Sequence, residues 1–300
     1  MAKCKVVNYS PLISVIIPSY NHVDYIENAI NSVLSQDYPN FELIVIDDSS
    51  SDGSDVLLVQ LSSKHKFIYV KNNHNLGLSK SLNKALNYAK GEFISLLASD
   101  DIFMTNKLSE CISLFNESAN FQSISFVFAN ALFMDNLSNP SPVELDGALV
   151  DNLIDYYCAN RPYLIQADSV SYIDLLRGNF IPALSVLINR RYLDMVGGFD
   201  EGYILEDLSL WLKLARYGQV KKSNKNVAFY RLHDSNTTNL KKDEINKDLY
   251  LILLREFSFV VNKPLHFIVW ARKTLIVASK LIFKGYFVFV LTSLLRRDCD

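Results

Sequence analysis

The chain has 300 residues, of which 49% are hydrophobic and 21% are charged, and its formal net charge is −2. This composition supports a hydrophobic core and argues against global disorder, and the near-neutral charge argues against a dedicated nucleic-acid-binding protein. The four cysteines, Cys4, Cys111, Cys158 and Cys299, are scattered without a CxxC pair. That pattern is typical of free thiols in a reducing compartment rather than of a disulfide framework or a zinc site.

Targeting signals are not evident in the sequence. The N-terminal stretch MAKCKVVNYSP lacks the apolar segment of a signal peptide. No stretch reaches the ~18 apolar residues that a spanning helix needs. We therefore expect the chain to stay in the cytoplasm.

The first 130 residues alternate between short apolar runs and helical stripes. Strands are predicted over residues 12–18, 41–47, 66–71, 92–98 and 123–130. Between them apolar residues recur at helical spacing, as at Leu78, Leu82 and Leu86, and Pro39 and Gly91 end two of these helices. Such alternation predicts an α/β protein with a Rossmann-like, mostly parallel sheet and helices on both faces.

The rest of the chain has a different pattern. Residues 131–180 lose the periodicity, whereas residues 185–218 predict a strand, a short helix, a glycine turn and an amphipathic helix. Residues from about 241 to 300 form a helical tail in which large apolar residues alternate with basic ones. These basic residues are Arg272, Lys273, Lys280, Lys284, Arg296 and Arg297. The pattern fits a helix pair lying in a membrane surface, or helices packed on the domain or in an oligomer interface.

Polar residues follow three of the predicted strands. They are Pro18, Ser19, Tyr20 and Asn21 after the first strand, Asp47, Asp48, Ser49 and Ser50 after the second, and Ser99, Asp100 and Asp101 after the fourth. Ligands of parallel α/β sheets bind beyond the carboxyl ends of the strands. One such cluster alone would be an ordinary polar turn, but three at the same edge predict a binding site.

The chemistry of this edge suggests a cation and a nucleotide. Mg²⁺ or Mn²⁺ prefers carboxylate oxygens and keeps positions open for substrate phosphates, so Asp100 and Asp101 suffice if a diphosphate completes the shell. Asp47 and Asp48, one strand over, could not bind the same ion as Asp100 and Asp101 without heavy repulsion, and they better suit hydrogen bonds from a base or a ribose. The sequence contains neither a GxGxxG fingerprint after the first strand nor a GxxxxGK[ST] phosphate loop.

Four segments together resemble a known family. They are SVIIPSYNHVDYIENAINSVLSQDYPNFELIVIDDSSSDGS, NLGLSKSLNKALNYAKGEFISLLASDD, VGGFDE and EDLSLWLKLARYG. In this order, and over about residues 11–235, they resemble the family 2 inverting glycosyltransferases of the GT-A fold, of the type that builds bacterial surface polysaccharides. The resemblance implies a GT-A domain over 1–240, with a nucleotide-sugar-binding half at 1–130 and an acceptor-binding half at 131–240, followed by the tail at 241–300.

The resemblance also implies roles on the donor side. The nucleotide-binding residues would be Pro18, Ser19, Tyr20, Asn21, Asp47, Asp48, Lys80, Ser99 and Asp100. Asp101 would be the direct ligand of Mn²⁺ or Mg²⁺, and His233 resembles a C-terminal histidine that completes the metal site in this fold. A histidine in a polar loop is equally an ordinary surface residue, and Lys80 in a helix is equally a solvated one.

On the acceptor side, Asp207 would be the catalytic base. Inversion needs a carboxylate opposite the leaving group to take the proton of the attacking hydroxyl, and a position at a helix N-terminus would keep Asp207 ionised. Such a residue is otherwise a simple helix-capping acid. The residues expected to contact the sugar or the acceptor are Gly197, Gly198, Glu206 and Trp211. The two glycines also fit a turn with positive φ. The tyrosines Tyr156, Tyr157 and Tyr163 fit either sugar stacking or core packing.

The function expected from the sequence is transfer of a hexose or N-acetylhexosamine from a nucleotide diphosphate sugar, a UDP-sugar above all. The acceptor would be a saccharide hydroxyl, on a lipid-linked oligosaccharide at the inner membrane face, with no role for nucleic acid. A sugar nucleotidyltransferase is one alternative, but it needs a glycine-rich basic loop where this chain has PSYNHVDY. A non-catalytic nucleotide-sugar or carbohydrate-binding module is the other, and it would not need Asp207.

Overall fold

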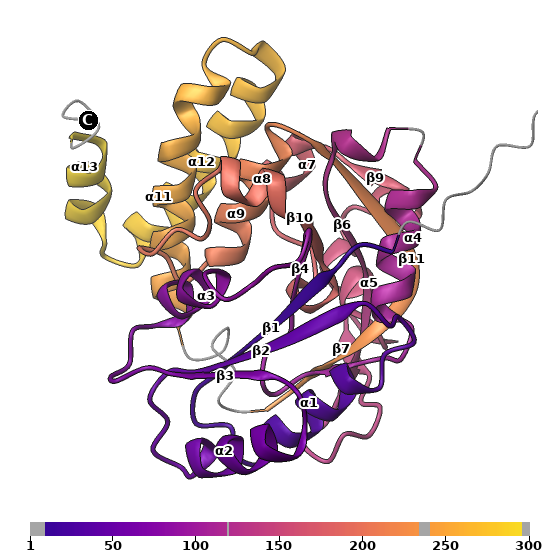
Figure 1. Cartoon of the computed structure of the whole chain (residues 1–300). Helices are drawn as coiled ribbons and strands as arrows, with labels where there is room; N and C mark the ends of the chain where they lie inside the picture. Colours follow the sequence, from indigo (N-terminus) through magenta and orange to yellow (C-terminus); the bar gives the residue numbers. More distant parts are fainter. Residues whose placement is uncertain (1–9, 119, 234–240, 296–300) are drawn as a thin grey trace, which may run out of the picture.

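The computed structural model describes residues 10–118, 120–233 and 241–295 (Figure 1). Within these residues one nine-stranded sheet has the order β3-β2-β1-β4-β10-β6-β11-β5, with β9 paired to β11. The strands are β1 Ile13–Ser19, β2 Phe41–Asp47, β3 Ile68–Lys71, β4 Phe93–Leu96, β5 Ile102–Phe103, β6 Ile124–Met134, β9 Ser169–Val170, β10 Leu187–Asn189 and β11 Gln219–Arg231. A separate hairpin joins β7 Val143–Leu145 to β8 Ala148–Val150.

The predicted parallel sheet is confirmed, with one antiparallel strand in its middle. Strand β1 pairs in parallel with both β2 and β4, and β2 pairs in parallel with β3. Strand β10 runs antiparallel between β4 and β6, and β11 then continues in parallel with β6. Because β1, β2 and β4 point the same way, the residues that follow them meet at one edge of the sheet.

Helices cover both faces of the sheet, and the alternation of side chains along β1 shows how. Val15 and Ile17 pack with residues of α1, α2 and α4, whereas Ile16 packs in the cluster that contains α3, α9 and α11. The helices are α1 Ile26–Leu34, α2 Ser54–Lys64, α3 Leu78–Leu86, α4 Lys107–Asn116, α5 Leu153–Cys158, α6 Tyr163–Gln166, α7 Tyr172–Arg177, α8 Arg190–Met195 and α9 Glu206–Ala215. Single turns of 3₁₀ helix lie at Phe121–Ser123 and Ala183–Ser185.

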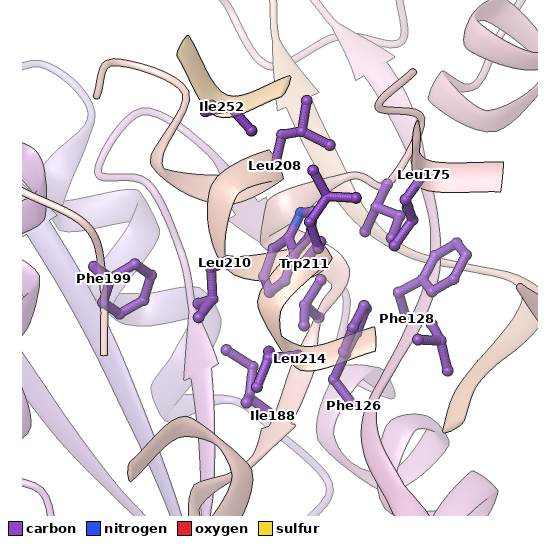
Figure 2. Packing of buried hydrophobic residues seen from close by; sticks show 14 of the residues in the cluster. Phe126, Phe128, Leu175, Ile188, Phe199, Leu208, Leu210, Trp211, Leu214 and Ile252 are labelled. Atoms are coloured by element: carbon purple, nitrogen blue, oxygen red, sulfur yellow. The ribbon is translucent and has the colours of Figure 1, made fainter. Parts of the chain in front are cut away.

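Three C-terminal helices follow, α11 Lys242–Val260, α12 Pro264–Phe283 and α13 Phe287–Leu295. We expected them to form a separate tail, but α11 belongs to the core of the domain. Ile252 is fully buried in the same cluster as Leu208 and Trp211 (Figure 2). Arg255 Nη1 donates to Ser209 Oγ of α9 at 2.7 Å, and Arg216 Nε donates to the buried Glu256 carboxylate at 3.1 Å. The sequence pattern could not show this, because it does not say what an amphipathic helix packs against.

The outer helices α12 and α13 keep a large apolar surface exposed. Phe283 is 94% exposed and Leu275 is 68% exposed, although Trp270 and Leu281 on the other side of α12 are buried. Among the described residues, no helix combines the length and the apolar character needed to cross a membrane.

We predict that the α11 packing is part of the global fold. Replacing Ile252 with Ala should lower the free energy of unfolding by about 2–5 kcal/mol, because it opens a cavity beside Leu208. The matched control Ile268→Ala, at a 63% exposed position of α12, should change it by about 0.5 kcal/mol or less. Guanidinium unfolding followed by tryptophan fluorescence measures both. An unchanged midpoint for Ile252→Ala would mean that α11 folds independently of the sheet.

Candidate active site

The first part of the site is formed where the end of β11 meets the loop after β4. Strands β5 and β11 pair antiparallel, with Ala228 opposite Phe103 and Phe229 opposite Ile102. This pairing places Arg231 beside the two carboxylates that precede β5. Arg231 N–H donates to Asp101 Oδ1 at 2.9 Å, and Arg231 Nε donates to the backbone oxygen of Asp100 at 2.7 Å.

The Arg231 side chain joins a third segment to this junction. It is fully buried, and its Nη1 donates to the backbone oxygens of Asp135 at 2.8 Å and Asn136 at 3.0 Å, just after β6. The guanidinium also lies 4.6 Å from the centre of the Tyr25 ring. The loops after β1, β4, β6 and β11 are therefore held together by one cation that is always protonated.

Asp100 faces two histidines. His233 Nε2 and Asp100 Oδ2 are 2.9 Å apart, and His22, from the loop after β1, brings its ring into the same group. One ligand atom from each of these three residues lies within 4.8 Å of the other two. Burial alone would raise the pKa of Asp100, but the hydrogen bond from His233 and the charge of His22 lower it overall, so the carboxylate is ionised. Carboxylate oxygen and imidazole nitrogen are ordinary ligands of divalent cations, so these residues fit Mn²⁺ chemically.

Asp101 has a different environment from the one we expected for a direct metal ligand. It is 4% exposed and accepts the hydrogen bond from Arg231, whereas Asp100, expected to contact the nucleotide, lies with His233. Burial and the neighbouring charge of Asp100 raise the pKa of Asp101 well above its usual range. The two adjacent carboxylates therefore have different partners: Asp101 is hydrogen-bonded to Arg231 inside the protein, and Asp100 faces the histidines.

The polar residues after β1 and β2 do meet at one edge, since Ser19 pairs with Asp47 at the ends of the strands. Asn21 has a φ of 55°; its backbone N–H donates to Ser50 Oγ, and its side chain accepts from Ser51 N–H at 2.8 Å. Tyr20 is 47% exposed at this edge. The Ser19 hydroxyl is buried and has no hydrogen-bond partner among the described residues.

Asp48 was expected to contact the nucleotide, but in this conformation it organises the chain itself. Its two oxygens accept hydrogen bonds of 2.8 Å from Asn72 Nδ2 and from the N–H groups of Leu76 and Gly77. It thereby closes the loop between β3 and α3.

Its neighbour Asp47 accepts from Ser50, and burial raises the pKa of Asp47. Lys80 is exposed on α3 and has no hydrogen bond to a described residue. Its position therefore matches the solvated alternative as well as the nucleotide role.

Asp207 lies in the first turn of α9, as predicted, with Asn179 beside it. Asn179 Nδ2 donates to Asp207 Oδ2 at 2.6 Å. Burial raises the pKa of Asp207, although hydrogen bonds from Leu208 N–H and Asn179 oppose the shift. We expected the helix N-terminus to keep this carboxyl ionised, but the effect of burial on its pKa is larger. Burial and the charge of Asp207 raise the pKa of Glu206 to about 8. Burial, followed by the charge of Asp207, also raises the pKa of Tyr157 on α5 to about 12.

The glycines expected to contact the acceptor form a turn that docks onto α3. Gly197 and Gly198 have φ values of 77° and 74°. Asn83 Oδ1 accepts from Phe199 N–H at 2.9 Å, and a Cβ at Gly198 would come within 2.8 Å of the same oxygen. The turn alternative therefore accounts for both glycines.

Trp211 was expected to contact the sugar, but it is fully buried in the core, against Phe126 (Figure 2). It belongs to the apolar stripe of α9, and that stripe faces the sheet. The expectation for Trp211 is therefore wrong in this structure.

Comparison with known proteins decides which family this arrangement belongs to. The model of the family described as glycosyl transferase family 2 matches residues 14–167. The chain belongs to glycosyl transferase family 2. Its relatives within this group include the putative teichuronic acid biosynthesis glycosyltransferase TuaG of Bacillus subtilis, which is 32% identical over 236 residues, 78% of this chain and 84% of TuaG. The glucosyltransferase WfgD of Escherichia coli is 30% identical over 239 residues, 79% of this chain and 83% of WfgD.

Solved structures show that this family 2 protein has a GT-A type fold. TarS of S. aureus, crystallised as residues 1–349 with UDP-GlcNAc, superposes with a TM-score of 0.63 at 20% identity, covering 90% of this chain and 71% of TarS. The mannosyltransferase PcManGT from Pyrobaculum calidifontis, in complex with GDP-Man and Mn²⁺, has a TM-score of 0.59 at 16% identity, covering 98% of this chain and 88% of PcManGT.

Three residues at the site of this glycosyltransferase were missed by sequence reasoning. His22 directly follows the first polar cluster, but nothing in the sequence placed it near Asp100. Asn179 lies in a segment without periodicity, and its partner Asp207 is 28 positions away. Arg231 looked like one more basic residue, because its burial depends on the β5–β11 pairing.

Proposed function

We propose that this family 2 protein is an inverting glycosyltransferase that moves a hexose or N-acetylhexosamine from a nucleotide diphosphate sugar, a UDP-sugar above all, to a saccharide hydroxyl. The observation that carries the proposal is the pairing of two features on one domain. A carboxylate–imidazole group stands at the carboxyl edge of the sheet, and a separate carboxylate, Asp207, stands at the start of α9.

On the donor side, Asp100 and His233 would hold Mn²⁺ or Mg²⁺, and Asp101 would support them through its hydrogen bond from Arg231. The bound cation supplies charge neutralisation for the departing diphosphate. Ser19, Tyr20 and Asn21, together with Pro18, Ser99 and Lys80, are proposed to bind the nucleotide. The unpartnered Ser19 hydroxyl supports this assignment, because a buried hydroxyl costs free energy unless a ligand or water satisfies it. Asp47 and Asp48 act indirectly, by shaping the loops that surround the nucleotide.

On the acceptor side, Asp207 removes the proton from the attacking hydroxyl. Asn179 Nδ2 donates to one carboxylate oxygen and Leu208 N–H donates to the other, so the two donors hold the carboxylate in one orientation. Burial raises the pKa of Asp207, which makes its carboxylate a stronger base than that of an ordinary aspartate. Glu206, with a pKa of about 8, stays protonated near neutral pH and can donate a hydrogen bond to the acceptor. Tyr157 is 43% exposed, and its ring offers a stacking surface for a sugar.

The acceptor is proposed to be a lipid-linked saccharide in surface polysaccharide assembly, O-antigen or capsule. WfgD and WfaP carry the name UDP-Glc:α-D-GlcNAc-diphosphoundecaprenol β-1,3-glucosyltransferase, and TuaG is named for teichuronic acid biosynthesis. These names support an acceptor whose saccharide is attached to a membrane-embedded lipid. The protein would then work in the cytoplasm, as a peripheral protein at the inner face of the plasma membrane.

The outer face of α12 and α13 supports this location. Its exposed apolar residues are Leu265, Ile268, Leu275, Ile276, Ile282, Phe283, Phe287, Val288, Leu291 and Leu294. Residues 261–295 contain no Asp or Glu, and their basic residues are Lys263, Arg272, Lys273, Lys280 and Lys284. Lys284 pairs with Asp243 of α11, and the other four basic residues have no ion pair to a described residue. An apolar face with an excess of positive charge is complementary to an anionic lipid surface, where apolar burial and attraction to headgroups act together.

The catalytic proposal is tested by Asp207→Asn. Transfer should fall by about 10²–10⁴-fold, since general-base catalysis contributes a factor of that size, while binding of the UDP-sugar stays unchanged. For the wild type, transfer should be lost as the pH falls through the raised pKa of Asp207, above the ordinary aspartate value of about 3.9. The control Asp194→Asn, at an exposed carboxylate of α8, should transfer normally. Near-normal transfer by Asp207→Asn would mean that another group is the base, and no transfer by the wild type would favour a non-catalytic binding module.

The membrane proposal is tested on the full chain with Leu275→Glu/Phe283→Glu. Flotation with anionic vesicles should fall by about tenfold or more, because two exposed apolar side chains that would enter the lipid surface become charged. The matched control is Val56→Glu/Val59→Glu, which changes two exposed valines on α2, far from α12 (Figure 1). Unchanged flotation of the α12 variant would contradict the proposal. If gel filtration then showed a change in oligomeric state, the face would be a contact between copies.

A further inference from the structure

Three segments that are distant in sequence bring His22, Asp100 and His233 together at the cation site. They are the loop after β1, the loop after β4 and the residue that follows the end of β11 by two positions. Building on the function proposed above, we propose that His22 is a third protein ligand of the cation, so that the site holds a transition-metal ion such as Mn²⁺ through two imidazoles and one carboxylate rather than Mg²⁺.

The hydrogen bonds of His22 suit this role. Its Nδ1 lies 2.7 Å from Ser99 Oγ, and Ser99 is 3% exposed. When Nδ1–H donates to the Ser99 hydroxyl, the lone pair of the ring is on Nε2, as metal-binding histidines require of the nitrogen that coordinates. Within the described residues, Nε2 of His22 has no hydrogen bond. The residue is thus oriented by one nitrogen and available at the other.

The surrounding rings hold the two histidines in place. The His22 and His233 rings are 6.0 Å apart with an interplanar angle of 87°, and the Tyr25 ring stacks on His233 at 5.7 Å. Tyr25 in turn lies on the buried guanidinium of Arg231. A ligand group whose members are packed and hydrogen-bonded loses little conformational entropy when an ion binds. Exposed histidines such as His65 lack any such packing.

The ligand set decides the choice of ion. Mg²⁺ favours carboxylates, phosphates and retained waters, whereas imidazole suits first-row transition metals, and two histidines with one carboxylate leave positions open for a substrate. A diphosphate fills such positions for Mn²⁺ as readily as for Mg²⁺. Two nitrogen ligands therefore shift the preference of the site toward Mn²⁺ and Co²⁺, and they make the loop after β1, which borders the nucleotide site, depend on the ion.

The test is electron paramagnetic resonance of the full chain with MnCl₂, alone and with UDP. Pulsed measurements of ¹⁴N couplings should show two histidine nitrogens on Mn²⁺ in the wild type and one in His22→Asn. The Kd for Mn²⁺ should rise by at least about tenfold in His22→Asn and stay unchanged in the matched control His65→Asn. Mg²⁺ should displace Mn²⁺ only at a large excess. Circular dichroism of each variant checks that it is folded.

One histidine nitrogen in the wild type would overturn the inference even if His22→Asn did not fold. Unchanged Mn²⁺ binding by folded His22→Asn, displacement by equimolar Mg²⁺, or a wild type that binds no Mn²⁺ with or without UDP would also overturn it. The proposed function is judged separately, by transfer from a panel of nucleotide sugars. Transfer by the wild type with only one nitrogen on the ion would refute the inference alone. Two nitrogens without transfer from any donor would refute the function alone.

Discussion

The contact between Arg231 and the loop after β4 is the constraint on which the site depends. The Arg231 backbone donates to Asp101, and its side chain holds the backbone of Asp100 and of the loop after β6. Because His233 follows Arg231 by two residues, this contact fixes where the imidazole meets the Asp100 carboxylate. Breaking the backbone contact would leave Asp101 as an uncompensated buried acid, which protonation or local rearrangement would have to relieve. A structural hydrogen bond thus determines the geometry of a chemical site.

Adjacent acids with different environments recur in this protein. Asp101 and Asp48 accept hydrogen bonds from the backbone of the chain. Asp100, in contrast, lies beside two histidines, and Asp207 lies beside one asparagine. In each case the sequence shows a carboxylate at the end of a strand or at the start of a helix. The environment decides whether that carboxylate holds the chain together or meets a ligand. Both roles are needed, because loops that carry ligand-binding groups must first be held by groups that do not.

The sheet was predictable because its information is local. Residues 41–47 coincide with β2, and the helix with Glu206 and Asp207 in its first turn is α9. Which of Asp100 and Asp101 lies beside the histidines was not predictable, since it depends on the pairing of β5 with β11, more than 120 residues further on. The burial of Trp211 was predictable from its place in an apolar helical stripe. The expected sugar contact was wrong because it gave this stripe too little weight. The packing of α11 on the domain could not be predicted from the sequence, because its apolar pattern equally fits a lipid surface.

The central claim is that the cation of this glycosyltransferase is centred on Asp100. Crystals soaked with MnCl₂ and UDP, measured at a wavelength where manganese scatters anomalously, test it most directly. The account predicts one strong anomalous peak within coordination distance of Asp100, His233 and His22, with Asp101 still hydrogen-bonded to Arg231. A peak on Asp101 alone, or a UDP bound at this edge without any manganese peak, would contradict it.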